Sequence, residues 1–333
     1  MKKTLLGFFT ALFNSQTAEK KYKEEDDKVE LEEHRTAIAD HTKAIELNPN
    51  YSEAYLNRGD AKSELDDHKG AIADYTKAIE LNPNYSTAYK YRGYAKAWLD
   101  DYKGAIADCT KAIELNPNDS EAYNSRGISK DWLEDYRGAI VDYIKAIELN
   151  PNYIEAYYNR GNAKYKLDDY KGAIADYTKA IELNSNYSEA YFMRGVSKAN
   201  LEDYRGAIAD YSKALELNYN YSEAYCKRGV SKDWLKDYKG AIEDLTNAIK
   251  LNPNYSEAYN LRGVSKAWLE DHRGAIADLT IAIELNPNDS WAYITRGHNK
   301  IKINKKDSAC LDWSKAGELG NSEAYDLIKQ YCK

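Results

Sequence analysis

The sequence predicts an all-α protein, a solenoid of about nine stacked helix–turn–helix units followed by a C-terminal capping helix. Two observations carry this prediction. The 6 prolines stand at positions 49, 83, 117, 151, 253 and 287, so successive prolines are separated by one constant step or by three such steps. The 31 tyrosines far outnumber the 4 phenylalanines, as expected if one aromatic position is copied many times. A fixed period of this length is typical of repeat architectures.

The repeated unit is defined by Ser52–Tyr85, and similar units begin at Ser86, Ser120, Ile154, Ser188, Ser222, Ser256 and Ser290. In the second of these units we expect one helix over about 87–99, with Ser86 as its N-cap, and another over about 102–115. The Asp100–Asp101 pair breaks the chain between them, and Asn116–Pro117 ends the second helix. Within each helix the apolar residues recur at spacings of three and four.

Two columns of small residues indicate how the paired helices pack. Glycine recurs at the position of Gly93, and alanine recurs at the position of Ala105. Glycine inside a helix costs about 1 kcal/mol relative to alanine, so its recurrence predicts a close approach of the two backbones. A single hairpin of this size cannot bury its own apolar face, whereas stacked hairpins can.

This arrangement divides the chain into five predicted segments. Residues 1–17 are a candidate signal peptide or an N-terminal amphipathic helix, because Lys2 and Lys3 precede an apolar stretch. A degenerate unit covers 18–51, seven regular units cover 52–289, a second degenerate unit covers 290–321, and a capping helix covers 322–333. The first segment favours export or association with the cell envelope, with a cytoplasmic location as the alternative.

Composition excludes several classes of function. The net charge is −7, which argues against nucleic-acid binding, since nucleic-acid binders usually carry a basic face. We expect contact with a membrane only if the N-terminal segment is retained. No cluster of histidine and cysteine has the spacing of a metal site, so we expect no cofactor and no enzymatic activity. His34, His41, His68 and His272 occupy tyrosine positions, whereas His298 stands alone near the exposed face.

The unit resembles the tetratricopeptide (TPR) repeat, in arrays of the bacterial multi-repeat type. The matching residues are the aromatic Tyr89, Gly93, Leu99, Ala105 and Pro117, and their equivalents in the other copies. The resemblance implies a right-handed superhelix whose first helices line a concave groove that binds a peptide or a partner protein. The Lys, Asn and Arg set of the chaperone-binding carboxylate clamp is absent, so we do not expect that ligand.

Two charged columns depart from the usual pattern of the family. An arginine, for example Arg126, replaces an apolar residue, and an aspartate, for example Asp142, follows each arginine at a fixed distance beyond the predicted turn. We predict an Arg–Asp pair inside every hairpin. The alternative is a ladder of arginines that binds anions.

The exposed face of the first helices is the candidate binding surface, because its residues differ between copies and include many aromatic ones. The candidates are Tyr91, Tyr94, Trp98, Ile128, Trp132, Tyr158, Tyr165, Phe192, Trp234 and Trp268. Aromatic residues are enriched among binding hot spots. The alternative is that they pack between neighbouring first helices. Cys226 is a further residue that could face the groove.

The sequence therefore predicts a non-enzymatic interaction module or assembly scaffold. Its expected ligand is a protein or peptide with some basic and some apolar side chains. The alternatives are a purely structural spacer and, less favoured, an enzyme with an unrecognised site. A disulfide between Cys310 and Cys332 is conceivable if the chain is exported.

Overall fold

The computed structural model describes residues 31–332, which contain helices and turns and no strand. The first described helix covers 31–47. The helices that follow are α2 (Ser52–Glu64), α3 (His68–Leu81), α4 (Ser86–Trp98), α5 (Tyr102–Leu115), α6 (Ser120–Trp132), α7 (Tyr136–Leu149), α8 (Ile154–Lys166), α9 (Tyr170–Leu183), α10 (Ser188–Asn200), α11 (Tyr204–Leu217), α12 (Ser222–Trp234), α13 (Tyr238–Leu251), α14 (Ser256–Trp268), α15 (His272–Leu285), α16 (Ser290–Lys302), α17 (Lys306–Glu318) and α18 (Glu323–Tyr331). The predicted all-α solenoid is confirmed. The candidate signal peptide lies outside the described residues.

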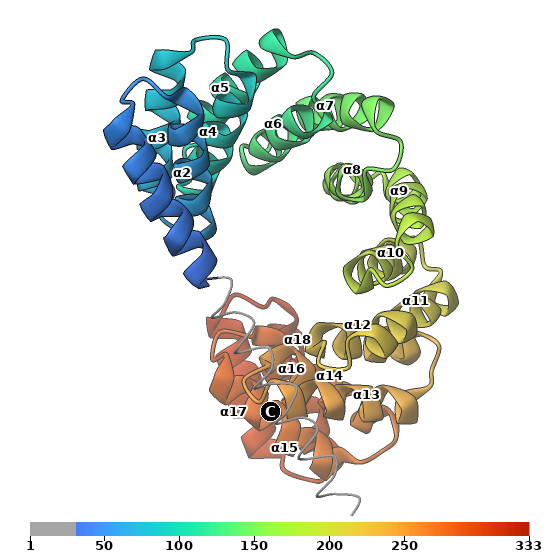
Figure 1. Cartoon of the computed structure of the whole chain (residues 1–333). Coiled ribbons are helices and arrows are strands. Elements are labelled where there is room, and N and C mark those ends of the chain that lie inside the picture. Colours follow the sequence, from blue (N-terminus) through green and yellow to red (C-terminus); the bar gives the residue numbers. More distant parts are fainter. Residues whose placement is uncertain (1–30, 333) are drawn as a thin grey trace, which may run out of the picture. The chain divides into compact units, whose positions relative to one another are not determined.

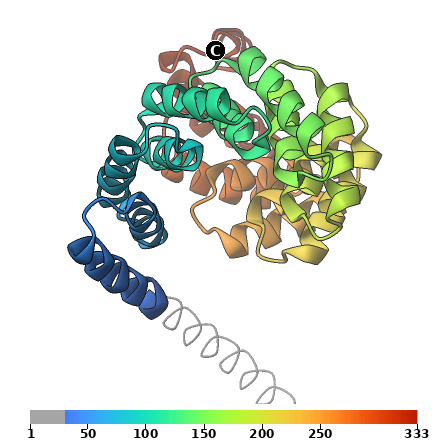
Figure 2. The same cartoon turned by 45° about the horizontal axis from the view of Figure 1, so that its top comes forward.

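The chain divides into two compact units, Met1–Asn159 and Arg160–Lys333. Within each unit, consecutive helices pack against one another in chain order, as the colour sequence in Figures 1 and 2 shows. The main contacts join helices that follow one another in the chain, such as α2 with α3 and α3 with α4. Several first helices also contact the next first helix more weakly, as α4 contacts α6 and α12 contacts α14. Among the described residues no helix is long and apolar enough to cross a bilayer.

The two helices of a hairpin approach each other closely at the glycine column, as predicted. A Cβ atom added to Gly93 would lie 3.2 Å from the carbonyl oxygen of Ala105 and 2.8 Å from the Sγ atom of Cys109. Ala105 and Cys109 are fully buried. Cys109 therefore fills the core position that tyrosine holds in other hairpins, also as predicted.

In six of the eight hairpins from residue 52 onward, the turn carries two acidic residues. Asp100 adopts a left-handed conformation with φ of 62°. The next residue, Asp101, caps α5 by accepting a hydrogen bond from the backbone amide of Gly104. The predicted break at these two residues is confirmed. The predicted N-cap at Ser86 is wrong, because α4 already begins at Ser86 and Tyr85 precedes it without a side-chain cap.

The predicted Arg–Asp pair is confirmed in all eight hairpins from residue 52 onward. The pairs are Arg58–Asp74, Arg92–Asp108, Arg126–Asp142, Arg160–Asp176, Arg194–Asp210, Arg228–Asp244, Arg262–Asp278 and Arg296–Asp312. Each arginine donates two hydrogen bonds to the carboxylate, which is the strong, bidentate form of this interaction. The anion-ladder alternative is not supported, because the guanidinium groups are already engaged within the chain.

Seven of these pairs belong to a larger network that links consecutive hairpins. A lysine one helical turn after the arginine reaches the same carboxylate, and Lys130 Nζ lies 2.7 Å from Asp142 Oδ2. The remaining arginine nitrogen reaches the previous hairpin, where Arg126 Nη1 donates to Thr110 Oγ1 over 3.2 Å. The network therefore fixes both the hairpin and its stacking on the preceding one.

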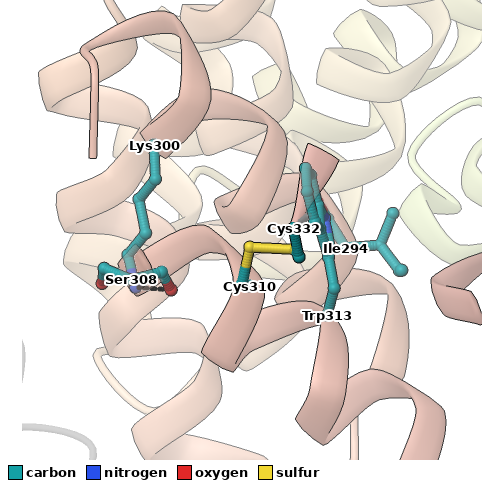
Figure 3. Close-up of a disulfide and its surroundings, with 6 residues drawn as sticks. All are labelled: Ile294, Lys300, Ser308, Cys310, Trp313 and Cys332. Atoms are coloured by element: carbon teal, nitrogen blue, oxygen red, sulfur yellow. Dashed lines mark hydrogen bonds between the residues drawn. A yellow bond between two sulfur atoms is a disulfide. The ribbon is translucent and has the colours of Figure 1, made fainter. Parts of the chain in front are cut away.

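The C-terminal end is closed by α18 and a disulfide. Cys310 on α17 is bonded to Cys332, which follows α18, and their Cα atoms are 5.8 Å apart (Figure 3). Beside this bond the indole of Trp313 is fully buried and donates to the carbonyl oxygen of Ile294 over 3.2 Å. Ala324 and Leu327 of α18 complete the same apolar cluster.

Candidate binding surface

Four tryptophans lie at the last position of their first helices, and each stacks on an aromatic ring of the preceding hairpin. Ring centroids are 5.5–5.8 Å apart and the planes are within 10° of parallel. The stacked pairs are His68–Trp98, Tyr102–Trp132, Tyr204–Trp234 and Tyr238–Trp268. The contact is thus made with the start of the preceding second helix. The four indoles remain 64–72% exposed.

In the first unit, two of these indoles form the walls of a pocket, here named the Trp98 pocket. It has a volume of about 420 Å³ and is lined by Tyr94, Ala97, Trp98, Asp100, Tyr102, Ile128 and Trp132. Four of the predicted residues, Tyr94, Trp98, Ile128 and Trp132, therefore come together. Ala97, Asp100 and Tyr102 complete the lining and were not among the residues that the sequence predicted.

Hydrogen bonds hold the polar rim of the Trp98 pocket in place. The Tyr102 hydroxyl donates to Asp100 Oδ1 over 2.7 Å, and this bond raises the pKa of the Tyr102 phenol. Burial raises the pKa of Tyr94. Both phenols stay protonated at neutral pH, so Asp100 is the charged group among the lining residues.

The remaining predicted residues are distributed differently. Tyr91, Tyr158 and Tyr165 are half-buried, and Tyr165 lies edge-on against Tyr170 with centroids 5.4 Å apart. The expectation that Phe192 lies on the exposed face is wrong. It is 4% exposed and packs against Tyr211 and Tyr221.

In the second unit Trp268 forms one wall of another pocket, here named the Trp268 pocket. Its volume is about 420 Å³, and its lining residues are Val264, Ala267, Trp268, His272, Thr295, His298, Asn299 and Lys302. The expectation that His298 stands alone is wrong, because His272 lines the same pocket. Cys226 is fully buried, so it does not face this surface.

Carboxylates at and near the starts of the first helices form a second feature of this surface. In the first unit they receive an ammonium group of the chain itself: Lys90 Nζ lies 2.6 Å from Glu121 Oε2 and 3.2 Å from Asp119 Oδ2. In the second unit, Glu257 and Asp289 line an open pocket of about 430 Å³ together with Tyr255 and Leu261. Glu257 also pairs with Lys227 Nζ over 3.3 Å. No group of three or more potential metal ligands occurs among residues 31–332.

The fold and the pockets together define a class of protein: a helical-repeat protein with an exposed aromatic surface. Models of the tetratricopeptide repeat match residues 52–85, 86–119, 154–187, 188–221 and 222–255, and a further TPR repeat model matches 133–168. Together these matches cover more than half of the chain, so the chain belongs to the tetratricopeptide repeat family. Proteins of this family bind proteins or peptides in general and are typically non-enzymatic.

Solved structures agree with this assignment. The chain is similar to YrrB, a TPR protein described as having an unusual peptide-binding site, with 27% identity and a TM-score of 0.50. That match covers 55% of this chain and 95% of YrrB. A TPR protein from Parabacteroides merdae is 21% identical with a TM-score of 0.55, over 74% of this chain and 99% of its own. It supports the fold alone. No curated protein gave a significant match.

Proposed function

We propose that this protein is a non-enzymatic scaffold that binds an extended peptide, or an extended segment of a partner protein, along the exposed face of its first helices. In the first unit the Trp98 pocket is the anchor point. One observation carries the proposal: Trp98 and Trp132 are each held by a stacked ring and yet remain 72% and 65% exposed.

Stacking prepares these side chains for binding. An indole already fixed by a neighbouring ring loses little conformational freedom when a ligand covers it, so more of the burial energy appears as affinity. Adjacent exposed indoles are also unusual on a surface without a partner. Covering one of them contributes about 1.5–3 kcal/mol, which is the range of a binding hot spot.

The charges of the surface favour a ligand with some basic side chains. Asp100 lines the Trp98 pocket, and Glu257 and Asp289 line the open pocket in the second unit. The position of Lys90 between Asp119 and Glu121 illustrates how a lysine side chain fits such carboxylates. The peptide-binding site named for YrrB supports a peptide as the ligand, without indicating its charge.

Panning a library of random dodecapeptides against the full chain tests the proposal. Selected peptides are then titrated calorimetrically against the wild type and against the Trp98→Ala, Trp132→Ala double variant. We expect the double variant to lose about 2 kcal/mol of binding free energy or more. Circular dichroism should show unchanged helicity, because both indoles are largely exposed.

Trp291→Ala is the matched control, since Trp291 is 60% exposed and lies outside the Trp98 pocket. It should bind the selected peptides as the wild type does. If the double variant binds them unchanged, the pocket is not the anchor. If no peptide is selected at all, the structural-spacer alternative is favoured.

A further inference from the structure

The last complete hairpin reverses the local charge of the array. In the seven preceding turns, from residue 66 to residue 271, an aspartate caps the second helix of the hairpin. In the last turn, Lys305 stands at the position of the capping aspartate and Asn304 precedes it. Lys305 provides no side-chain cap for α17. Loss of an aspartate cap costs helix stability, so folding alone does not explain the exchange. Departures of this kind are expected where function imposes them.

The Trp268 pocket lies beside this turn and has a counterpart in the first unit. Five repeats separate the two, so that Trp268, His272, His298 and Lys302 occupy the repeat positions of Trp98, Tyr102, Ile128 and Trp132, in that order. The two pockets therefore occupy the same place in their hairpins. One indole wall is kept, while two imidazoles and an ammonium group replace a phenol, an isoleucine and the second indole.

Lys302 is the residue that gives the Trp268 pocket its charge. It is exposed at the end of α16 and makes no ion pair among the residues that the structure describes. No Asp or Glu occurs in α16 or among the lining residues. Arg273 and Lys305, which follow the lining residues His272 and Lys302 closely in the sequence, line a separate pocket of about 270 Å³.

The polar lining of the Trp268 pocket is held in a fixed arrangement. Asn299 Nδ2 donates to the carbonyl oxygen of Thr295 over 2.8 Å, so its Oδ1 accepts from His272 Nδ1, 2.9 Å away. His298 is faced by Glu323 and Lys302, and burial lowers the pKa of its imidazole. His298 is therefore neutral at pH 7, and Lys302 supplies the positive charge.

We propose that the Trp268 pocket binds a peptide carboxylate that lies next to an apolar side chain. The ammonium group of Lys302 pairs with the carboxylate, and Trp268 and Val264 cover the apolar side chain. The inference rests on the proposed function, because the ligand is a peptide. It adds that the Trp268 pocket in the second unit selects an acidic residue of the peptide. The carboxylate-lined pockets, in contrast, favour basic residues of the ligand.

Four dye-labelled octapeptides of glycine and serine test this proposal by fluorescence anisotropy with the full chain. Three have blocked ends and carry a central leucine followed by glutamate, glutamine or lysine. The fourth ends in leucine with a free terminal carboxylate. We expect the glutamate peptide to bind about tenfold more tightly than the lysine peptide, as one charge-assisted contact allows. The fourth peptide shows whether a chain-terminal carboxylate serves as well.

Three variants identify the groups responsible. Lys302→Glu should reverse the order of the glutamate and lysine peptides. Lys166→Glu is the matched control, since Lys166 stands at the same position of an earlier hairpin and is also exposed; it should behave as the wild type. Trp268→Ala should weaken all four peptides, because it removes the apolar wall.

The outcomes separate this inference from the proposed function. Equal binding of the glutamate and lysine peptides, or an unchanged order in Lys302→Glu, would overturn the carboxylate assignment. Absence of binding by all four peptides would overturn it as well. Neither result bears on the Trp98 pocket, which is tested by its own double variant and its own selected peptides.

Discussion

Asp142 shows how one buried charge fixes the geometry of a hairpin. Its side chain is only 2% exposed, and it accepts hydrogen bonds from Arg126 at 2.6 and 2.9 Å while Lys130 lies 2.7 Å away. Two cations therefore depend on one carboxylate. Breaking a buried pair by removing one partner is much more costly than replacing both partners together.

Asp142→Ala should lower the free energy of unfolding by about 3–5 kcal/mol, because it leaves Arg126 and Lys130 without their shared partner. Urea unfolding measures the loss, and hydrogen exchange should place it in α6 and α7. Glu148→Ala is the control: Glu148 pairs with Lys145 on the exposed face, and such pairs contribute about 0.5 kcal/mol or less. Wild-type stability of the aspartate variant would contradict a structural role for the pair.

The Arg–Asp pairs could be predicted at this scale, whereas the burial of Phe192 could not. The pairs follow from the constant spacing between the arginine and aspartate columns across a short turn. Phe192 belongs to a column that also holds Leu56, Lys90 and Asn124, and such variation suggested exposure. All four side chains are 7% exposed or less. Polar residues are accepted there because they find partners, as Lys90 does in Asp119 and Glu121.

At the scale of helices, the disulfide joins α18 to α17 across 22 residues. The other two cysteines, Cys109 and Cys226, are fully buried, and burial raises their pKa values to about 12 and about 11. Their thiols are therefore protonated and inert at neutral pH.

Cys310→Ser should destabilise the end of the array by about 3 kcal/mol, the chain-entropy contribution of a crosslink over a loop of this length. Hydrogen exchange should increase in α18 and in the part of α17 around Trp313, and α2 to α6 should exchange as before. Cys226→Ser provides a comparison that leaves the crosslink intact. Unchanged exchange of α18 in Cys310→Ser would mean that apolar packing alone holds the cap.

Contacts between elements of different hairpins were the least predictable feature of the candidate surface. The Tyr102–Trp132 stack and the pairing of His272 with His298 in one pocket depend on how far each hairpin rotates relative to the previous one. Packing of side chains between hairpins sets that rotation. The length of the repeat does not determine this rotation. The tryptophan column could therefore be recognised from the sequence, whereas the residues that contact it could not.

At the scale of the whole chain, the same kinds of contact recur between neighbouring hairpins within each unit. Arg262 Nη1 donates to Thr246, and Arg228 Nη1 donates to Ser212 in the same way. Trp268 stacks on Tyr238, and Trp234 stacks on Tyr204. The fold class was predictable for this reason, because a local pattern copied along the chain specifies a nearest-neighbour structure.

Deletion of residues 222–255 should therefore leave a folded protein. In the shortened chain Arg262 would meet Ser212 and Trp268 would meet Tyr204, so no class of contact is lost. We expect unchanged mean helicity per residue by circular dichroism and a cooperative thermal transition. Deletion of residues 239–272 serves as a comparison. It has the same length and also removes one hairpin in register, but it joins the starts of two second helices. Loss of helicity in both would show that longer-range interactions are needed.

The stacked ring pairs also give the protein an optical signature. Parallel aromatic rings with centroids 5.5–5.8 Å apart couple their electronic transitions, so each pair should contribute to the near-ultraviolet circular dichroism of the native chain. A ligand that tilts an indole away from its neighbour would change this signal without changing the far-ultraviolet spectrum. The occupancy of the surface can then be followed on the unlabelled protein by spectroscopy.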